Sequence, residues 1–150
     1  VSVTFDSSAD GSWPYSFFSS TQIKTLAKGY APAIFRYGGT AEDEITYCVE
    51  SNNNDYRASY PCLNSTKFFD LTSFAKTVGW KFVFGLNEIN PRYANNSWNP
   101  SNAITLMQAV IKTGDPKLVF AYELGNEPDL YSSNGLSSNL TGKQEGIDFS

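Results

Sequence analysis

The chain has 150 residues, enough for one ordinary domain, and its net charge of −4 argues against a nucleic-acid partner. It contains no histidine, which excludes Ser-His and Cys-His nucleophile systems and most zinc sites. Catalysis would therefore depend on carboxylates, Tyr, Lys or Arg. Aromatic residues make up 15% of the chain, and such side chains supply both core area and stacking platforms for sugar rings.

The N-terminal part predicts two strands with a helix between them. Residues 1–6 alternate apolar and polar side chains, as a half-buried strand does. Residues 20–29 supply a capping Ser, an apolar helical face and a terminal Gly, which predict a short helix. The apolar run 33–37 predicts the second strand. It leads into Gly38-Gly39-Thr40, where the backbone needs conformational freedom or a close approach.

Residues 41–66 are interpreted as a long polar insertion. We expect Cys48 and Cys62 to form a disulfide that pins it, since unstructured loops of this length are uncommon unless they are tied or functional. The acidic triplet Glu42-Asp43-Glu44 lacks the alternating oxygen-ligand spacing of a calcium loop. We interpret the triplet as a solvated edge, and we expect neither a metal nor a cofactor.

The rest of the chain repeats the strand–helix pattern. Residues 70–79 predict a helix with Asp70 as its cap, and residues 80–86 predict a strand that is apolar on both faces. Residues 100–114 predict a helix that opens with Pro, and the apolar run 118–122 predicts a fourth strand. Strands that alternate with helices form a parallel sheet with right-handed crossovers.

Every predicted strand ends in a polar or Gly-rich segment. In a parallel sheet these exits share one edge, so a functional site is expected there. The alternative is that these exits are ordinary polar loops. That interpretation accounts for each exit taken singly, but it accounts less well for all of them at one edge. The exits are Asp6, residues 36–40, Asn87 with Glu88, and Asn126 with Glu127.

The last of these exits, Asn126-Glu127-Pro128, is the strongest candidate for chemistry. Gly125 permits a sharp exit from the strand and Pro128 prevents its continuation, so Asn126 and Glu127 project at the strand end. A carboxyl there is a candidate general acid. The alternative is a strand-to-loop turn with a solvated Glu.

Three glycosylation sequons, at Asn64, Asn95 and Asn139, lie in turn-rich stretches. Together with a pairable cysteine couple they favour a secreted, extracellular glycoprotein, with a lysosomal or cell-surface location as variants. The alternative is a cytosolic protein with two inert thiols and unused sequons. No apolar stretch is long enough for a membrane span, and we expect a secreted chain that starts at Val1 to be a processed one.

Four motifs together resemble heparanase-like glycoside hydrolases, family 79. The resemblance runs over nearly the whole chain and implies the first four βα units of a (β/α)₈ TIM barrel, incomplete in this chain. Residues 1–150 would then be the N-terminal half of a glycosidase domain, with the insertion at 41–66. The motifs are Arg36-Tyr37-Gly38-Gly39-Thr40, Phe84-Gly85-Leu86-Asn87, Trp98-Asn99 with Asn102-Ala103, and Glu123-Leu124-Gly125-Asn126-Glu127-Pro128.

The resemblance also implies a retaining β-glycosidase that hydrolyses glucuronic-acid-containing or related glycans with two carboxylates. By position, Glu127 matches the acid/base and Asn126 the partner that contacts the sugar 2-hydroxyl. The nucleophile of the family lies on a later strand, so the chain alone carries half a site. The expected substrate-binding residues are Asp6, Arg36, Thr40 and Asn87.

A half barrel leaves apolar edge strands unpaired, so we expect a partner. It would be a missing C-terminal half, a second processed chain or another copy. Residues 56–67 hold only two basic side chains, which favours a less charged glycan over a strongly sulfated one. The alternative function is a non-catalytic, heparanase-like glycan-binding or structural component of an extracellular assembly. A Glu at the end of a later strand would favour the catalytic function, and its absence would favour the non-catalytic one.

Overall fold

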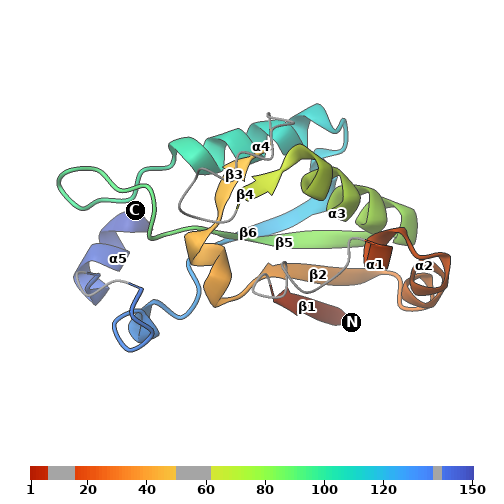
Figure 1. Cartoon of the computed structure of the whole chain (residues 1–150), viewed down its shortest axis with the longest axis horizontal. Helices are drawn as coiled ribbons and strands as arrows, with labels where there is room; N and C mark the ends of the chain where they lie inside the picture. Colours follow the sequence, from red (N-terminus) through yellow and green to blue (C-terminus); the bar gives the residue numbers. More distant parts are fainter. Residues whose placement is uncertain (7–15, 50–61, 137–139) are drawn as a thin grey trace.

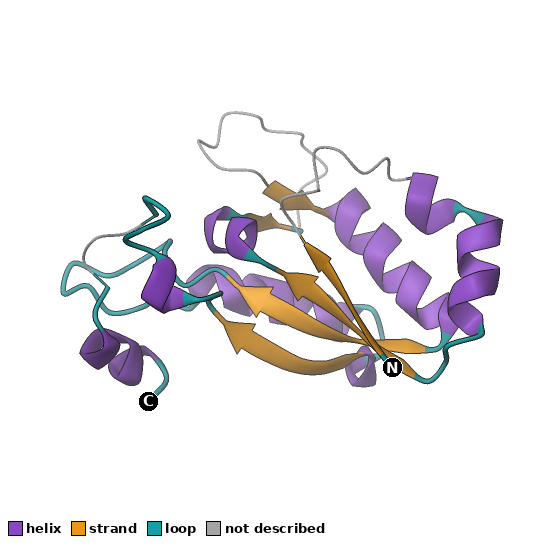
Figure 2. Ribbon diagram, turned by 90° about the horizontal axis from the view of Figure 1, so that it is seen from below, coloured by secondary structure: helices purple, strands orange, loops and turns teal. Residues whose placement is uncertain are grey.

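The computed structural model describes residues 1–6, 16–49, 62–136 and 140–150. Its centre is a parallel sheet of four strands in the order β1-β2-β5-β6 (Figure 1). Figure 2 shows the strand arrows pointing toward the end of the molecule where the last helix lies. The strand bounds are β1 (Ser2–Asp6), β2 (Ala33–Gly38), β5 (Trp80–Leu86) and β6 (Val119–Leu124).

The helices follow the strands in turn. Between β1 and β2 the chain forms α1 (Ser16–Ser19) and α2 (Thr21–Lys28), and α3 (Ser65–Val78) precedes β5. The helix α4 (Ser101–Lys112) connects β5 to β6, and α5 (Gly142–Asp148) ends the chain. Each new main-sheet strand is added beside the preceding one, so right-handed crossovers place α2, α3 and α4 on one face. This winding is consistent with part of a TIM barrel, whereas the count of four βα units stays a prediction.

An aromatic cluster fills the space between the sheet and its helices. Phe5, Phe35 and Phe82 project from β1, β2 and β5 and are 7%, 3% and 0% exposed. The ring of Phe35 lies 5.2 Å from that of Phe82 and 6.3 Å from that of Phe74 on α3. Because side chains alternate along a strand, the opposite face carries other residues, among them Arg36 of β2. The helices therefore cover one face of the sheet and leave Arg36 on the other.

The insertion is more structured than the sequence suggests. It contains the 3₁₀ helix η2 (Thr40–Glu44) and the parallel pair β3 (Thr46–Cys48) and β4 (Cys62–Asn64). The predicted disulfide between Cys48 and Cys62 is confirmed, with a Cα–Cα distance of 6.0 Å. The predicted solvated edge is wrong, because Glu42 and Asp43 are only 1% and 0% exposed. η2 turns both carboxylates inward, where Tyr47 donates a hydrogen bond to Glu42.

The helix α3 starts earlier than predicted. Its N-cap is Asn64, whose Oδ1 accepts a hydrogen bond from the Lys67 N–H at 3.0 Å. Asp70, the predicted cap, lies inside the helix. The cause is that β4 leads directly into α3, so no loop remains between them.

The two edge strands are less buried than predicted. On β6, Phe120 is 60% exposed and Tyr122 37%, and on β1, Val3 is 41% exposed. In the described sheet, β1 and β6 are each paired on one side, whereas the central strands β2 and β5 are paired on both sides. The other predicted strands and helices agree with the structure to within a few residues. Among the described helices, none combines the length and the apolar character that a bilayer crossing needs.

Candidate active site

An ion-paired clamp lies at the C-terminal edge of the sheet. Arg36 on β2 donates Nε–H to Glu123 Oε2 at 2.6 Å and Nη2–H to Glu123 Oε1 at 3.0 Å. The same Nη2 donates to Asn126 Oδ1 at 2.9 Å. Such a bidentate contact fixes the plane of the guanidinium. The Glu123 hydrogen bond raises the pKa of Arg36, so the guanidinium stays charged.

This clamp determines which way the Asn126 amide points. Because its oxygen faces Arg36, its Nδ2 faces Thr40 Oγ1 at 3.5 Å and Glu127 Oε2 at 3.4 Å. The structure therefore brings together four of the predicted site residues: Arg36, Thr40, Asn126 and Glu127. An amide donor and a carboxylate held side by side can engage neighbouring oxygens of one bound sugar.

Glu127 itself has an unusual backbone conformation. Its φ of 52° and ψ of 55° place a non-glycine residue in the left-handed region. Its side chain is exposed, and the 3₁₀ helix η4 (Pro128–Leu130) follows directly. Strained backbone of this kind persists only where the surroundings over-determine it, and it clusters at functional sites.

Asp6 lies against the glycine pair that follows β2. Gly39 has a φ of +105°, and a Cβ built there would be 2.7 Å from Asp6 Oδ1. Only glycine allows the two segments to come this close. The structure thus places Asp6 beside the loop that carries Thr40.

Three buried titratable side chains underlie the site. Sequence reasoning placed Glu88 at this edge, but it missed Asp43 and Tyr131. Asp43, Glu88 and Tyr131 are 0%, 0% and 1% exposed. Desolvation raises the pKa of Asp43 to about 6, with hydrogen bonds from Tyr131 and backbone N–H groups acting against the rise. Desolvation, with Glu145 and Asp148 nearby, raises the pKa of Glu88 to about 7.

Asn87, a predicted substrate-binding residue, uses its side chain on the protein itself. It is 4% exposed, its Nδ2 donates to the Ile45 carbonyl at 2.9 Å, and its Oδ1 accepts from Asn90 N–H at 2.8 Å. Its backbone N–H donates to the Tyr47 hydroxyl. Sugar contact by Asn87 stays a prediction, and these contacts favour a structural role instead.

The loop after β5 is fixed to the C-terminal helix. Arg92 forms an ion pair with Asp148 on α5 and also donates to the carbonyls of Glu88 and Asn96, both at 2.8 Å. Asp148 accepts a second hydrogen bond from Trp98 N–H at 2.9 Å, and such hydrogen bonds lower its pKa. No sequence pattern indicates this pairing, because Arg92 and Asp148 lie in separate polar segments.

The predicted glycosylation sites differ in their surroundings. Asn95 is exposed, and its Oδ1 accepts from the Ser97 hydroxyl at 2.7 Å. Asn64 caps α3 through Oδ1, whereas a glycan would attach to Nδ2 of the same amide. Asn139 lies outside the described residues.

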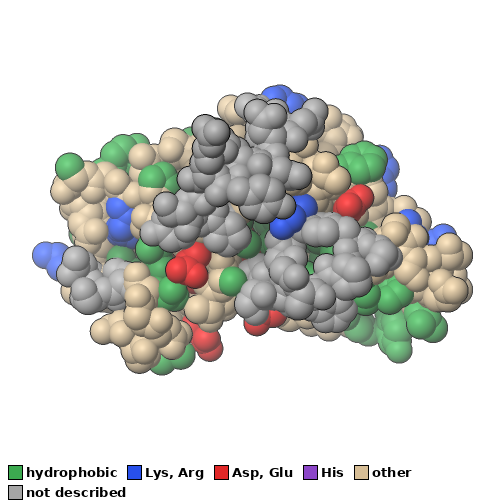
Figure 3. Space-filling view, in the orientation of Figure 1, with side chains coloured by type: hydrophobic (Ala, Val, Ile, Leu, Met, Phe, Trp, Pro, Cys, Tyr) green, Lys and Arg blue, Asp and Glu red, His purple; other side chains and the backbone are tan. Residues whose placement is uncertain are grey.

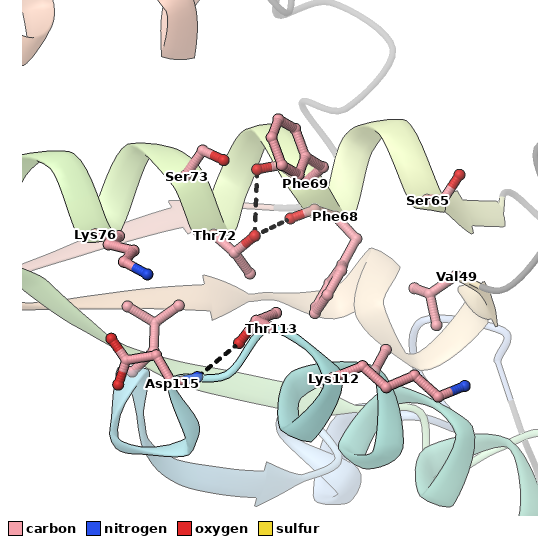
Figure 4. A pocket seen from close by; sticks show the side chains of 12 residues that line it. Val49, Ser65, Phe68, Phe69, Thr72, Ser73, Lys76, Lys112, Thr113 and Asp115 are labelled. Atoms are coloured by element: carbon pink, nitrogen blue, oxygen red, sulfur yellow. Dashed lines mark hydrogen bonds between the residues drawn. The ribbon is translucent and has the colours of Figure 1, made fainter.

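A hollow of about 740 Å³ lies elsewhere, on the helix side of the sheet. Figure 4 shows it between α3, with Phe68 and Lys76, and the end of α4, with Lys112. None of the predicted site residues lines it. Figure 3 shows acidic and basic side chains scattered over one face, without a gathered basic patch among the atoms drawn in colour.

Residues 18–150 match the family model described as glycosyl hydrolase family 79, N-terminal domain. Among curated proteins, the chain is 29% identical to a hyaluronoglucuronidase of Hirudo nipponia, with 98% of this chain and 35% of that protein covered. It is also 29% identical to heparanase of Rattus norvegicus, with 99% and 35% covered. The chain thus spans about a third of the length of these relatives.

One further relative and one solved structure differ in what their names report. Inactive heparanase-2 of Mus musculus is 36% identical over 67% of this chain and 16% of that protein. The crystal structure of a 4-O-α-L-rhamnosyl-β-D-glucuronidase from Fusarium oxysporum superposes with a TM-score of 0.59 at 19% identity. It covers 97% of this chain and 32% of the other, and at this identity it supports the fold alone.

Proposed function

This chain belongs to glycosyl hydrolase family 79, and we propose that it supplies the acid/base half of a retaining β-glycosidase acting on glucuronic-acid-containing glycans. The observation that carries the proposal is the clamp of Arg36 on Asn126. It aims the amide Nδ2 into the space beside Glu127, where a sugar 2-hydroxyl would accept a hydrogen bond. Such a bond strengthens in the oxocarbenium-like transition state and raises the rate.

The proposed reaction needs two carboxyl groups about 5–5.5 Å apart. Glu127 gives its proton to the glycosidic oxygen as the C–O bond breaks, while the nucleophilic carboxylate bonds to the anomeric carbon. Glu127 then takes a proton from water, and the resulting attack releases the sugar and frees the nucleophile. The nearby Glu123 is held by Arg36 and so is a poor candidate for the nucleophile.

We place the nucleophile on polypeptide outside residues 1–150. The chain spans 35% of the rat and leech relatives, and its edge strands β1 and β6 are open. A longer chain, a second processed chain or another copy would complete the barrel. We use "the completed protein" for this chain together with the polypeptide that completes its barrel.

The glucuronide substrate class rests on the names of the relatives, a hyaluronoglucuronidase and a heparanase. We further propose that the protein is a secreted glycoprotein. The disulfide Cys48–Cys62 and the exposed Asn95 support this location. Asn64 and Asn139 are the other proposed glycan sites.

The substitution Glu127→Gln in the completed protein tests the catalytic role. For an alkyl β-glucuronide, whose leaving group needs protonation, kcat should fall by roughly 10²–10⁴-fold. For a 2,4-dinitrophenyl β-glucuronide, bond cleavage should be much less affected, because that leaving group needs little protonation. Asp129→Asn is the control, since it removes an exposed carboxylate two positions away. Equal activity of Glu127→Gln and wild type on the alkyl glucuronide would refute the proposal.

The alternative is a non-catalytic relative that binds glycans, and the match to inactive heparanase-2 favours it. In that case the completed protein would hydrolyse neither glucuronide but would still bind a glucuronic-acid-containing oligosaccharide in calorimetry. Thr40→Ala would weaken that binding, because Thr40 lies at the same strand edge.

A further inference from the structure

Three buried side chains from separate segments meet beneath the Asn126–Glu127 turn. Asp43 comes from η2, Glu88 from the loop after β5, and Tyr131 from the residue after η4. They are almost fully buried, with exposed fractions of 0%, 0% and 1%. We call Asp43, Glu88 and Tyr131 the buried support.

The buried support holds the backbone of the turn rather than its side chains. The Asn126 N–H points at two acceptors, Asp43 Oδ2 at 3.1 Å and the Tyr131 hydroxyl oxygen at 3.2 Å. The same hydroxyl lies 3.4 Å from Glu88 Oε2, and its single hydrogen is shared between the Asp43 and Glu88 carboxyl groups. One backbone amide is therefore connected to all three members.

The preceding residue is fitted to the same group. A Cβ at Gly125 would lie 2.5 Å from the Tyr131 hydroxyl oxygen and would overlap the Glu88 carboxyl. The Gly125 N–H also donates to the Leu86 carbonyl at 2.9 Å, which ties it to the end of β5. Residues 125 and 126 are thus fixed from below, and the left-handed Glu127 follows immediately.

Stability alone does not explain this arrangement. Burying carboxyl groups is costly unless their hydrogen bonding is complete. Asp43 Oδ1 and Glu88 Oε1 are buried and have no hydrogen-bond partner within the described residues. An apolar side chain of similar volume at either position would avoid that cost. At position 43, however, it could not accept the Asn126 N–H, and at position 88 it could not accept the Tyr131 hydroxyl hydrogen.

We propose that Asp43, Glu88 and Tyr131 are positioning residues that hold the backbone of the Asn126–Glu127 turn and so aim the Asn126 amide and the Glu127 carboxyl at the substrate. This inference rests on the proposed function. None of the three touches the sugar. They act through one backbone amide, whereas Arg36 acts from above through the Asn126 side chain.

The test is Tyr131→Phe in the completed protein, which removes the hydroxyl and changes the volume little. A displacement of about 1 Å at a reacting group costs on the order of 10²-fold in rate. We expect kcat/KM, which reports cleavage of the glycosidic bond, to fall at least about tenfold more on an alkyl β-glucuronide than on a 2,4-dinitrophenyl β-glucuronide. The selectivity arises because only the alkyl leaving group depends on a well-placed proton donor.

Tyr47→Phe is the matched control. Tyr47 is another buried phenol, 2% exposed, but it holds Glu42, the Gly85 carbonyl and Asn87 N–H instead of Asn126. It should lower the melting temperature without a preference between the two leaving groups. The ratio of activity on the alkyl glucuronide to activity on the dinitrophenyl glucuronide is compared between Tyr131→Phe and Tyr47→Phe. If the two variants give the same ratio, the buried support is only structural and the inference is overturned.

A second pair keeps the test decisive should Tyr131→Phe not fold. Asp43→Asn keeps an oxygen that can accept the Asn126 N–H, whereas Asp43→Ala removes it. We expect the extra loss of activity on the alkyl glucuronide, relative to the dinitrophenyl glucuronide, to be larger in Asp43→Ala than in Asp43→Asn. Equal losses in the two variants would contradict the inference. Glu127→Gln separates the two proposals. Without a leaving-group preference in Glu127→Gln the proposed function fails, whereas its absence in Tyr131→Phe alone refutes only the positioning role.

Discussion

At the scale of single residues, Gly39 is where the loop after β2 meets the end of β1. Its φ of +105° excludes most side chains, and a Cβ there would lie only 2.7 Å from Asp6 Oδ1. Two independent costs therefore oppose any substitution. One is backbone strain, and the other is displacement of a side chain that we expect to contact the sugar.

The substitution Gly39→Ala is predicted to lower the free energy of unfolding by about 1–3 kcal/mol from backbone strain, with the Asp6 clash in addition. Gly114→Ala is its control, because Gly114 has a φ of +74° but no atom within 4 Å of a built Cβ. Denaturant titration of the completed protein measures both. A loss at Gly39 no larger than that at Gly114 would contradict the close approach of Asp6. A raised KM in Gly39→Ala alone would connect Asp6 to the sugar.

The buried Glu88 makes a prediction about pH. Burial raises its pKa from 4.5 to about 7, and Glu145 and Asp148 on α5 and Asp43 on η2 add to the rise, while Arg92 opposes it. Between these two values the folded state keeps a proton that the unfolded state has released. Its contribution to stability is therefore present at about pH 4.5 and is lost as the pH rises toward 7.

Melting temperatures of wild type and Glu88→Gln, recorded between about pH 4.5 and 8, check this sign. The wild type should lose stability relative to the glutamine variant as the pH rises through the window. If the two curves stay parallel, Glu88 does not titrate with a raised pKa in the folded protein.

Sequence reasoning placed Arg36, Asn126 and Glu127 at one edge because each lies at or just beyond the end of an apolar run, and parallel strands bring such ends together. It failed for Asp43, since three adjacent acids ordinarily face solvent. Asp43 accepts a hydrogen bond from the Asn126 N–H, a partner 83 positions away along the chain. No local pattern reports a contact of that range. Tyr131 was missed for the same reason, because it lies in a polar segment after Pro128.

At the scale of elements, the short pair β3 and β4 connects the insertion to α3. β4 ends at Asn64, which is at the same time the cap of α3, so strand and helix are continuous. The disulfide joins the far end of β3 to the start of β4. Asn102 on α4 then fixes β3, accepting from Tyr47 N–H at 2.8 Å and donating to the Tyr47 carbonyl at 2.9 Å.

Replacing both Cys48 and Cys62 by Ser should lower the free energy of unfolding by about 3 kcal/mol, the typical value for a loop of this length. Thermal melts of the oxidised, reduced and doubly substituted completed protein measure the effect. The reduced and substituted forms should agree. Equal melting temperatures of all three would show that the disulfide does not stabilise the fold.

The start of α3 could have been found from the sequence. Asn is among the best N-cap residues, and Asn64 precedes Ser-Thr-Lys and an apolar helical run. Asn64 is instead interpreted from the sequence only as a glycosylation site, because it begins a sequon. The pairing of β3 with β4 could not have been found, because strands of three residues carry too little pattern to be distinguished from a loop.

At the scale of the whole molecule, the described main sheet has two open edge strands, β1 and β6. Val3 on β1 and Phe120 and Tyr122 on β6 are exposed although they belong to strands of the main sheet. Open edges with apolar side chains promote association with other strands. These exposed apolar edges are consistent with a chain that spans about a third of the length of the relatives it matches.

We predict that the isolated 150-residue chain self-associates and lacks a cooperative unfolding transition. In the completed protein, by contrast, the amides of β6 should exchange hydrogen slowly. Calorimetry, light scattering and hydrogen exchange measure these differences. A monomeric isolated chain with a sharp thermal transition would contradict the need for a partner. Phe69→Ser on α3 is a control, because Phe69 is 67% exposed on a helix that packs against the central strand β5.

The strand order β1-β2-β5-β6 follows the order in which a ribosome makes the chain. Each new strand joins an edge that already exists, and none has to be inserted between two earlier ones. Cys48 and Cys62 both leave the ribosome before β5, so the covalent link can close while the sheet is still growing. The last edge, β6, is then the template on which a further strand of the completed protein would align.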